Sequence, residues 1–148
     1  MKRFLSILIV TLTVGIVVGA CSPKSSESQM RELIEESNKE CPTSIDHLTT
    51  LKEIKIDGDF VTYVCEIDET QLDIETMLSR RAIYKQNISN TVGSQITNPE
   101  SASYQFFQLV MESGKGLRHH YAGNRSGKFL DIDITNEQLQ QLANSQNK

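Results

Sequence analysis

The sequence of 148 residues contains no tryptophan and few other aromatic residues, with four tyrosines and five phenylalanines. It also lacks an excess of positive charge, because 15 lysines and arginines stand against 19 aspartates and glutamates, a net charge of −4. Proteins that bind nucleic acid use basic side chains to neutralise phosphates. The charge balance therefore argues against nucleic acid as a partner, and against a domain surface that binds anionic lipid.

The ligand spacings of common metal sites are also absent from the sequence. Two of its three histidines, His119 and His120, are adjacent in a predicted strand. Adjacent strand residues point to opposite faces of a sheet, so these two cannot both bind one ion without a bulge. No third ligand stands at a spacing typical of a metal site. We therefore expect no metal and no other cofactor.

One long apolar run is present, and it lies at the start of the chain. Lys2 and Arg3 precede the apolar stretch 4–18, and the small residues Gly19 and Ala20 follow it. A short positive region, an apolar core and small residues before a cleavage site form the secretory pattern. A transmembrane helix needs about 20 apolar residues, so a cleaved signal peptide is the favoured interpretation.

The residues Val18-Gly19-Ala20-Cys21 resemble the lipobox of bacterial lipoproteins. This resemblance implies that residues 1–20 are a lipoprotein signal peptide and that the thiol of Cys21 carries lipid. Two or more acyl chains make a stable membrane anchor, whereas one chain binds only marginally. The predicted location is thus the cell envelope, anchored through Cys21. Ser22, where an aspartate would resemble an inner-membrane retention signal, favours the outer membrane in a cell that has one.

The rest of the chain suits one domain. Without residues 1–20, 128 residues remain, in which 13 basic residues face 19 acidic ones and give a charge of −6. The polar, serine-rich composition after Cys21 predicts a flexible tether over 21–28. We expect a single domain over 29–143 and a disordered tail over 144–148.

Hydrophobic periodicity predicts the elements of the first half of the domain. Apolar residues at helical spacing predict a helix over 28–39, which ends before Cys41-Pro42. Alternating apolar residues predict strands over 51–57 and 60–67. The turn signal at Asp57-Gly58-Asp59 joins these two strands into a β-hairpin.

The next segment carries signals for two helices. Thr70 and Asp73 predict the start of one helix, and a polar loop is expected over 90–98. Asn98-Pro99-Glu100 predicts the start of another helix, which ends at Gly114.

The last segment predicts a second hairpin and a final helix. Strands are expected over 117–122 and 130–134, around the turn 123–127, and Thr135 with Gln138 predicts a helix cap. The predicted fold is therefore α+β: an antiparallel sheet of two β-hairpins with helices packed on one face. The element order reads αββα twice, and both tandem duplication and coincidence remain open.

A second resemblance lies in the domain itself. The stretch 38–46, followed by a hairpin that bears Tyr63, is similar to uncharacterised small exported bacterial proteins. Those proteins have no assigned reaction, so this resemblance implies no mechanism.

The cysteines of the domain allow two interpretations. Cys65, paired with one of the three histidines, could serve as a nucleophile, but it lies on the predicted core face of a strand, where a thiol is inert. Cys41 and Cys65 could instead form a disulfide, because exported proteins mature where disulfides persist. A buried free thiol at Cys65 is the alternative.

The turn after residue 122 is the other candidate site. It combines Gly123 and Gly127 with Arg125 and Lys128 in an otherwise acidic protein. Backbone N–H groups and cations in such a loop can bind a phosphate or carboxylate. A plain hairpin turn with charged residues explains the same composition.

The sequence therefore predicts a lipid-anchored lipoprotein of the cell envelope, a non-catalytic binding or accessory module. Its expected partners are the membrane, through lipid on Cys21, and an envelope protein or glycan. Two alternatives remain: a small envelope enzyme that uses Cys65 or another polar site, and an inhibitor of a secreted enzyme.

Overall fold

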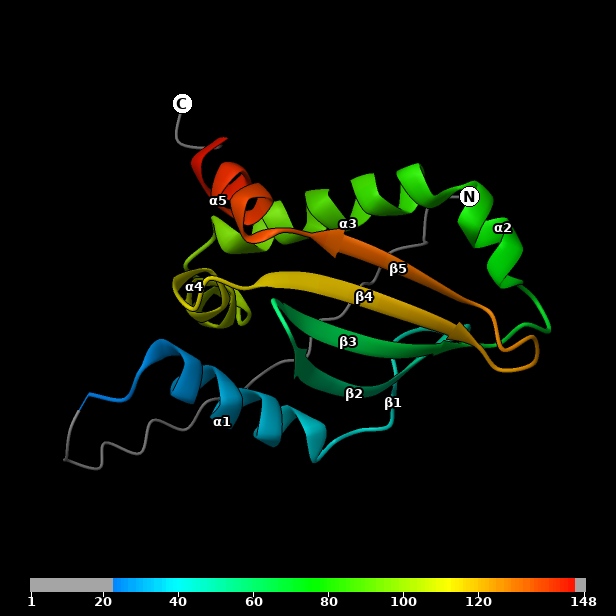
Figure 1. Ribbon diagram of the computed structural model, residues 1–148, viewed down its shortest axis with the longest axis horizontal. Helices are drawn as coiled ribbons and strands as arrows, with labels where there is room; N and C mark the ends of the chain where they lie inside the picture. Colours follow the sequence, from blue (N-terminus) through cyan, green and yellow to red (C-terminus); the bar gives the residue numbers. More distant parts are fainter. Residues whose placement is uncertain (1–22, 146–148) are drawn as a thin grey trace.

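The computed structural model describes residues 23–145, which Figure 1 shows as a curved sheet with helices along it. The predicted signal peptide and Cys21 lie outside the described residues. Within residues 23–145, no helix is long and apolar enough to span a membrane. The elements follow in the order α1 (Ser26–Asn38), β1 (Thr43–Ser44), β2 (Thr49–Asp57), β3 (Phe60–Ile67), α2 (Ile74–Ser79), α3 (Arg81–Ile96), α4 (Tyr104–Glu112), β4 (Gly116–Gly123), β5 (Phe129–Ile134) and α5 (Asn136–Ser145).

The first helix begins earlier than the sequence predicts. The Ser25 side chain accepts a hydrogen bond from the backbone N–H of Ser28 at 3.2 Å, which caps α1 at its N-terminus. Met30 and Ile34, one helical turn apart, are both buried. Three residues assigned to the predicted tether therefore belong to the folded domain.

The sheet contains both predicted hairpins, in the order β1-β2-β3-β4-β5. β2 pairs with β3 and β4 pairs with β5, each antiparallel, which confirms the α+β class. The two hairpins join through β3 and β4, which run parallel, with Tyr63 opposite His119. The sequence predicts antiparallel pairing throughout, and the structure differs at this junction. The segment α2-α3-α4 returns the chain to the end of the sheet where β3 starts, and such a crossover produces parallel pairing.

This crossover also differs in detail from the prediction. The expected loop over 90–98 is mostly helical, because α3 continues to Ile96. Asn98 does not start a helix: its side chain accepts the N–H of Glu100 in a turn, and α4 begins at Tyr104. The cap of α2 is Asp73, which accepts the N–H of Thr76 at 2.7 Å.

The final helix carries the predicted capping box. Thr135 N–H donates to Gln138 Oε1 at 3.0 Å, and Gln138 N–H donates to Thr135 Oγ1 at 3.3 Å. α5 continues through Ser145, so the helix includes two residues of the predicted tail. The remaining three tail residues lie outside the described part.

Alternation along the strands separates two faces of the sheet. One face packs against the helices and supplies much of the core, through the buried residues Val61, Tyr63, Cys65, Ile67, Leu117, His119, Tyr121, Leu130, Ile132 and Ile134. The opposite face of β3, β4 and β5 carries charged and aromatic side chains, most of them partly or fully exposed. We call this second surface the open face.

Candidate functional site

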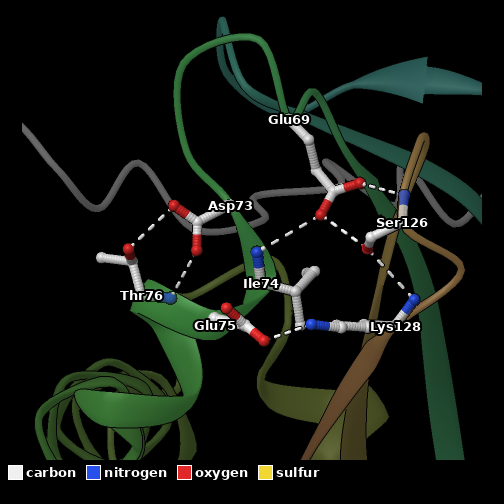
Figure 2. Close-up of polar contacts among 7 residues, drawn as sticks. All are labelled: Glu69, Asp73, Ile74, Glu75, Thr76, Ser126 and Lys128. Atoms are coloured by element: carbon white, nitrogen blue, oxygen red, sulfur yellow. Dashed lines mark hydrogen bonds and ion pairs between the residues drawn. The ribbon is translucent and has the colours of Figure 1, made fainter.

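The turn between β4 and β5 binds a carboxylate, and that carboxylate is Glu69 of the same chain. Glu69 Oε2 accepts the backbone N–H groups of Arg125 at 2.8 Å and Ser126 at 2.7 Å. Glu69 Oε1 accepts the Ser126 hydroxyl at 2.7 Å and the N–H of Ile74 at 3.4 Å. Figure 2 shows the Glu69 side chain between the turn and the start of α2. We call this arrangement the Glu69 cradle.

Two glycines make the Glu69 cradle sterically feasible. A Cβ atom on Gly123 would lie 2.3 Å from Cδ of Glu69, so a larger residue there would displace the carboxylate. Gly127 has a φ of 68°, a left-handed conformation that favours glycine. Hydrogen bonds from Ser126 and Arg125 lower the pKa of Glu69 to about 2, so the carboxylate is ionised at neutral pH.

The Glu69 cradle links two connections that lie far apart in the sequence. Asn124 Oδ1 accepts the N–H of Glu69 at 3.1 Å, and the N–H of Asn124 donates to the carbonyl of Ile67. The side chain of Lys128 pairs with Glu75 of α2 (Figure 2). The connection after β3 is thereby attached to the turn after β4, at the end of the sheet where these parallel strands finish.

The predicted anion-binding residues therefore lie together, but they contact the chain itself. Gly123 and Gly127 shape the turn, Arg125 contributes its backbone N–H, and Lys128 binds a different carboxylate. Sequence reasoning missed Glu69, which lies more than 50 residues from the turn. No local pattern connects the two, because only the parallel pairing of β3 with β4 brings them to the same end.

The open face is a second candidate site, on the other side of the sheet. Arg118 and Asp133 form a bidentate ion pair, with Nε–Oδ1 and Nη2–Oδ2 distances of 2.8 Å each. The Arg118 guanidinium lies 4.5 Å from the centre of the Phe60 ring. Hydrogen bonding to Arg118 lowers the pKa of Asp133.

A second pair lies next to this one on the same strands. Nδ1 of His120 and Oδ1 of Asp131 are 2.6 Å apart, and the Phe129 ring centre is 5.3 Å from that of His120. Phe129 is 56% exposed and is one of the large apolar side chains that the described residues leave open to solvent. The open face thus presents a solvent-exposed aromatic ring beside polar side chains that already pair with one another.

The candidate nucleophile and its candidate bases do not form an accessible site. Cys65 is 1% exposed, and burial raises the pKa of its thiol to about 12, which keeps it protonated. His119 shares the core face with Cys65, whereas His120 lies on the open face, as strand alternation predicts. His47 lies in the exposed segment between β1 and β2. Within residues 23–145, no three His, Cys, Asp or Glu side chains group as metal ligands.

The sequence left open either a disulfide between Cys41 and Cys65 or a buried free thiol at Cys65, and both cysteines of the domain are free thiols in the structure. Cys65 pairs across the sheet with Leu51, and Leu51 pairs in turn with Thr43 of β1. β2 thus lies between Cys65 and the strand that follows Cys41. Two strand spacings, about 10 Å, therefore separate Thr43 from Cys65.

Comparison with known proteins gives a similarity of fold. No family model matches the chain, and no curated protein matches it. A candidate secreted protein from Pseudomonas aeruginosa has 10% sequence identity and a TM-score of 0.60, over 77% of this chain and 92% of that one. A pilotin from the type 2 secretion system of Vibrio vulnificus, EpsS, has 12% identity and a TM-score of 0.49, over 77% and 91% of the two chains. The chain is thus similar in fold to a small candidate secreted protein of bacteria, and the similarity extends no further than the fold.

Proposed function

We propose that this chain is a lipid-anchored module of the cell envelope that binds a partner and does not catalyse a reaction. The lipid is attached to Cys21, and the folded domain begins a few residues later, at α1. The partner is an envelope protein or a glycan that contacts the open face.

The observation that supports this proposal most strongly is the exposed Phe129 ring. Burying such a side chain contributes about 1.5–3 kcal/mol, and this gain is available only when another molecule covers the ring. Aromatic anchors surrounded by polar groups are typical of binding hot spots. The neighbouring pairs of His120 with Asp131 and Arg118 with Asp133 supply that polar surround.

The chemistry of the buried residues supports a non-catalytic role. The Cys65 thiol is inaccessible and protonated, and His119 is 3% exposed with a pKa lowered to about 4 by burial. Neither side chain can reach a substrate in solution. These two residues therefore give no support to the alternative of a small enzyme that uses Cys65.

Site-specific photo-cross-linking in intact cells tests the proposal. A photoreactive residue replaces Phe129 in one variant of the full chain and Ile83 in a matched variant. The two positions are comparable, since their side chains are 56% and 60% exposed on different elements. We expect a discrete adduct with an envelope protein or glycan at position 129 and none of that mass at position 83. Absence of such an adduct at position 129 would contradict the proposal.

A further inference from the structure

We infer that the corner between α2 and α3 is a second membrane contact, which docks on anionic lipid headgroups while the lipid on Cys21 holds the chain. This inference rests on the proposed anchor. It concerns residues of α2 and α3 rather than the strands of the open face, and its occupant is lipid rather than the proposed partner. We define the corner by its residues: Leu78, Arg80, Arg81, Ile83 and Lys85.

The corner differs in charge from the rest of the chain. Residues 76–99 contain three basic side chains and no acidic one. The remainder of the mature chain holds 10 basic and 19 acidic residues. The net charge of the domain argues against lipid binding, but the segregated charge makes this one corner complementary to an anionic surface.

Exposed apolar side chains lie in the same segment as these basic residues. Leu78 is 43% exposed and Ile83 is 60% exposed, and all six residues from 78 to 83 are exposed. Among residues 23–145, the large exposed apolar side chains are these two and Phe129. Ile83 stands between Arg81 and Lys85 in α3, and Leu78 lies at the end of α2 just before Arg80, so each exposed apolar side chain has a basic residue within two positions.

The nearby acidic groups do not cancel the charge of the corner. Asp133 is close enough for Arg81 and Lys85 to lower its pKa, but Asp133 already forms its bidentate pair with Arg118. Glu75, on the preceding turn of α2, pairs with Lys128. Arg80 and Arg81 therefore retain charge for an external anion.

The position of Cys21 allows the lipid anchor and the corner to contact the membrane at the same time. Five chain steps separate Cys21 from Ser26, and they span at most about 17 Å. The corner stands at the opposite end of the molecule from the start of α1 (Figure 1). A domain that lies lengthwise would therefore touch the membrane at both ends. The anchor raises the effective concentration of the corner at the surface, so a weak contact is sufficient.

Lipid photo-cross-linking of the full mature lipoprotein in vesicles tests this inference. The photoreactive residue is placed at position 83 or 129, in vesicles of phosphatidylcholine with or without phosphatidylglycerol. We expect phospholipid adducts at position 83, increased by phosphatidylglycerol, and few at position 129. Removing two charges with Arg80→Gln and Arg81→Gln should reduce the adduct roughly 30-fold, from the contribution of each cation at an anionic surface. The control Lys52→Gln with Lys55→Gln removes the same charge from β2 and should leave the adduct unchanged.

Three results would overturn the inference: equal lipid adducts at positions 83 and 129, no response to phosphatidylglycerol, or a protein adduct at position 83 in cells in place of lipid. The anchor is measured separately, by flotation of the protein with the vesicles and by fatty-acid label. Protein that floats and carries label but gives no lipid adduct at position 83 contradicts the corner contact alone. Protein that carries no label contradicts the proposed anchor as well.

Discussion

His119 is a buried histidine that the fold keeps neutral, and its replacement by phenylalanine should remove a measurable acid sensitivity. The side chain is 3% exposed, and Nδ1 has no hydrogen-bond partner within the described part of the chain. Its ring stacks on Tyr63 at 5.1 Å and on Tyr121 at 6.3 Å. His119→Phe keeps an aromatic ring between the two tyrosines and removes the unsatisfied nitrogen.

The size of the change in stability with pH follows from the shift in the pKa of His119. Burial lowers the pKa of His119 from 6.5 to about 4, so the unfolded chain takes up a proton at a higher pH than the folded one. Stability is therefore lost as the pH falls from about 6.5 towards 4. The loss amounts to about 2 kcal/mol at pH 5 and approaches about 3 kcal/mol below pH 4. At pH 7.5 the variant also avoids a buried unpaired nitrogen, which costs about 1–3 kcal/mol.

Urea unfolding at pH 7.5 and pH 5.0 measures the effect. The stability difference between His119→Phe and wild type should grow by about 2 kcal/mol at the lower pH. Carboxylates that titrate in both proteins cancel in this difference. Tyr121→Phe, a change at a neighbouring buried ring whose pKa burial raises above its ordinary value, is the control and should show no such growth, because Tyr121 does not titrate between these two pH values. An equal difference at both pH values would refute the assignment of His119 as a buried neutral group.

Three further predictions concern the Glu69 cradle, the cysteines and the open face. Glu69→Gln should speed hydrogen exchange at the amides that the carboxylate accepts in the β4–β5 turn; unchanged exchange would contradict the cradle. Thiol counting on denatured, unreduced protein should find Cys41 and Cys65 both free, with Cys65 unreactive in the folded protein; a bridged pair would contradict the structure. Arg118→Gln should raise the pKa of Asp133 towards its ordinary value, so thermal unfolding should show a loss of stability at pH 7 that shrinks as the pH falls through the acidic range; a loss that is the same at every pH would contradict the pairing.

Local signals were sufficient for most of the fold. Alternation located both hairpins, and the capping box at Thr135 located α5, because strand faces and helix caps depend on residues a few positions apart. The polar residues over 90–98 were misleading. Their sequence lacks a continuous apolar stripe, but α3 buries Val92 and Ile96 against the core, and this packing extends the helix.

The candidate sites depend on contacts that the sequence does not encode locally. Glu69 reaches the β4–β5 turn because β3 and β4 are parallel, a pairing decided by the length and path of the crossover. The pair of Arg118 with Asp133 lies in a hairpin that the sequence did locate, but the register that places these two residues opposite each other came from the structure. The composition of the turn left an anion site and a plain hairpin turn open, and the structure shows that its backbone N–H groups bind Glu69 of the same chain.

The central claim is that lipid on Cys21 anchors a folded binding module to the envelope. Metabolic labelling with a radioactive fatty acid, followed by mass spectrometry of the mature N-terminus, tests it most directly. The wild-type protein should carry label and begin at an acylated Cys21, whereas Cys21→Ser should carry none and remain uncut. Wild-type protein without label, or with its N-terminus elsewhere, would contradict the claim.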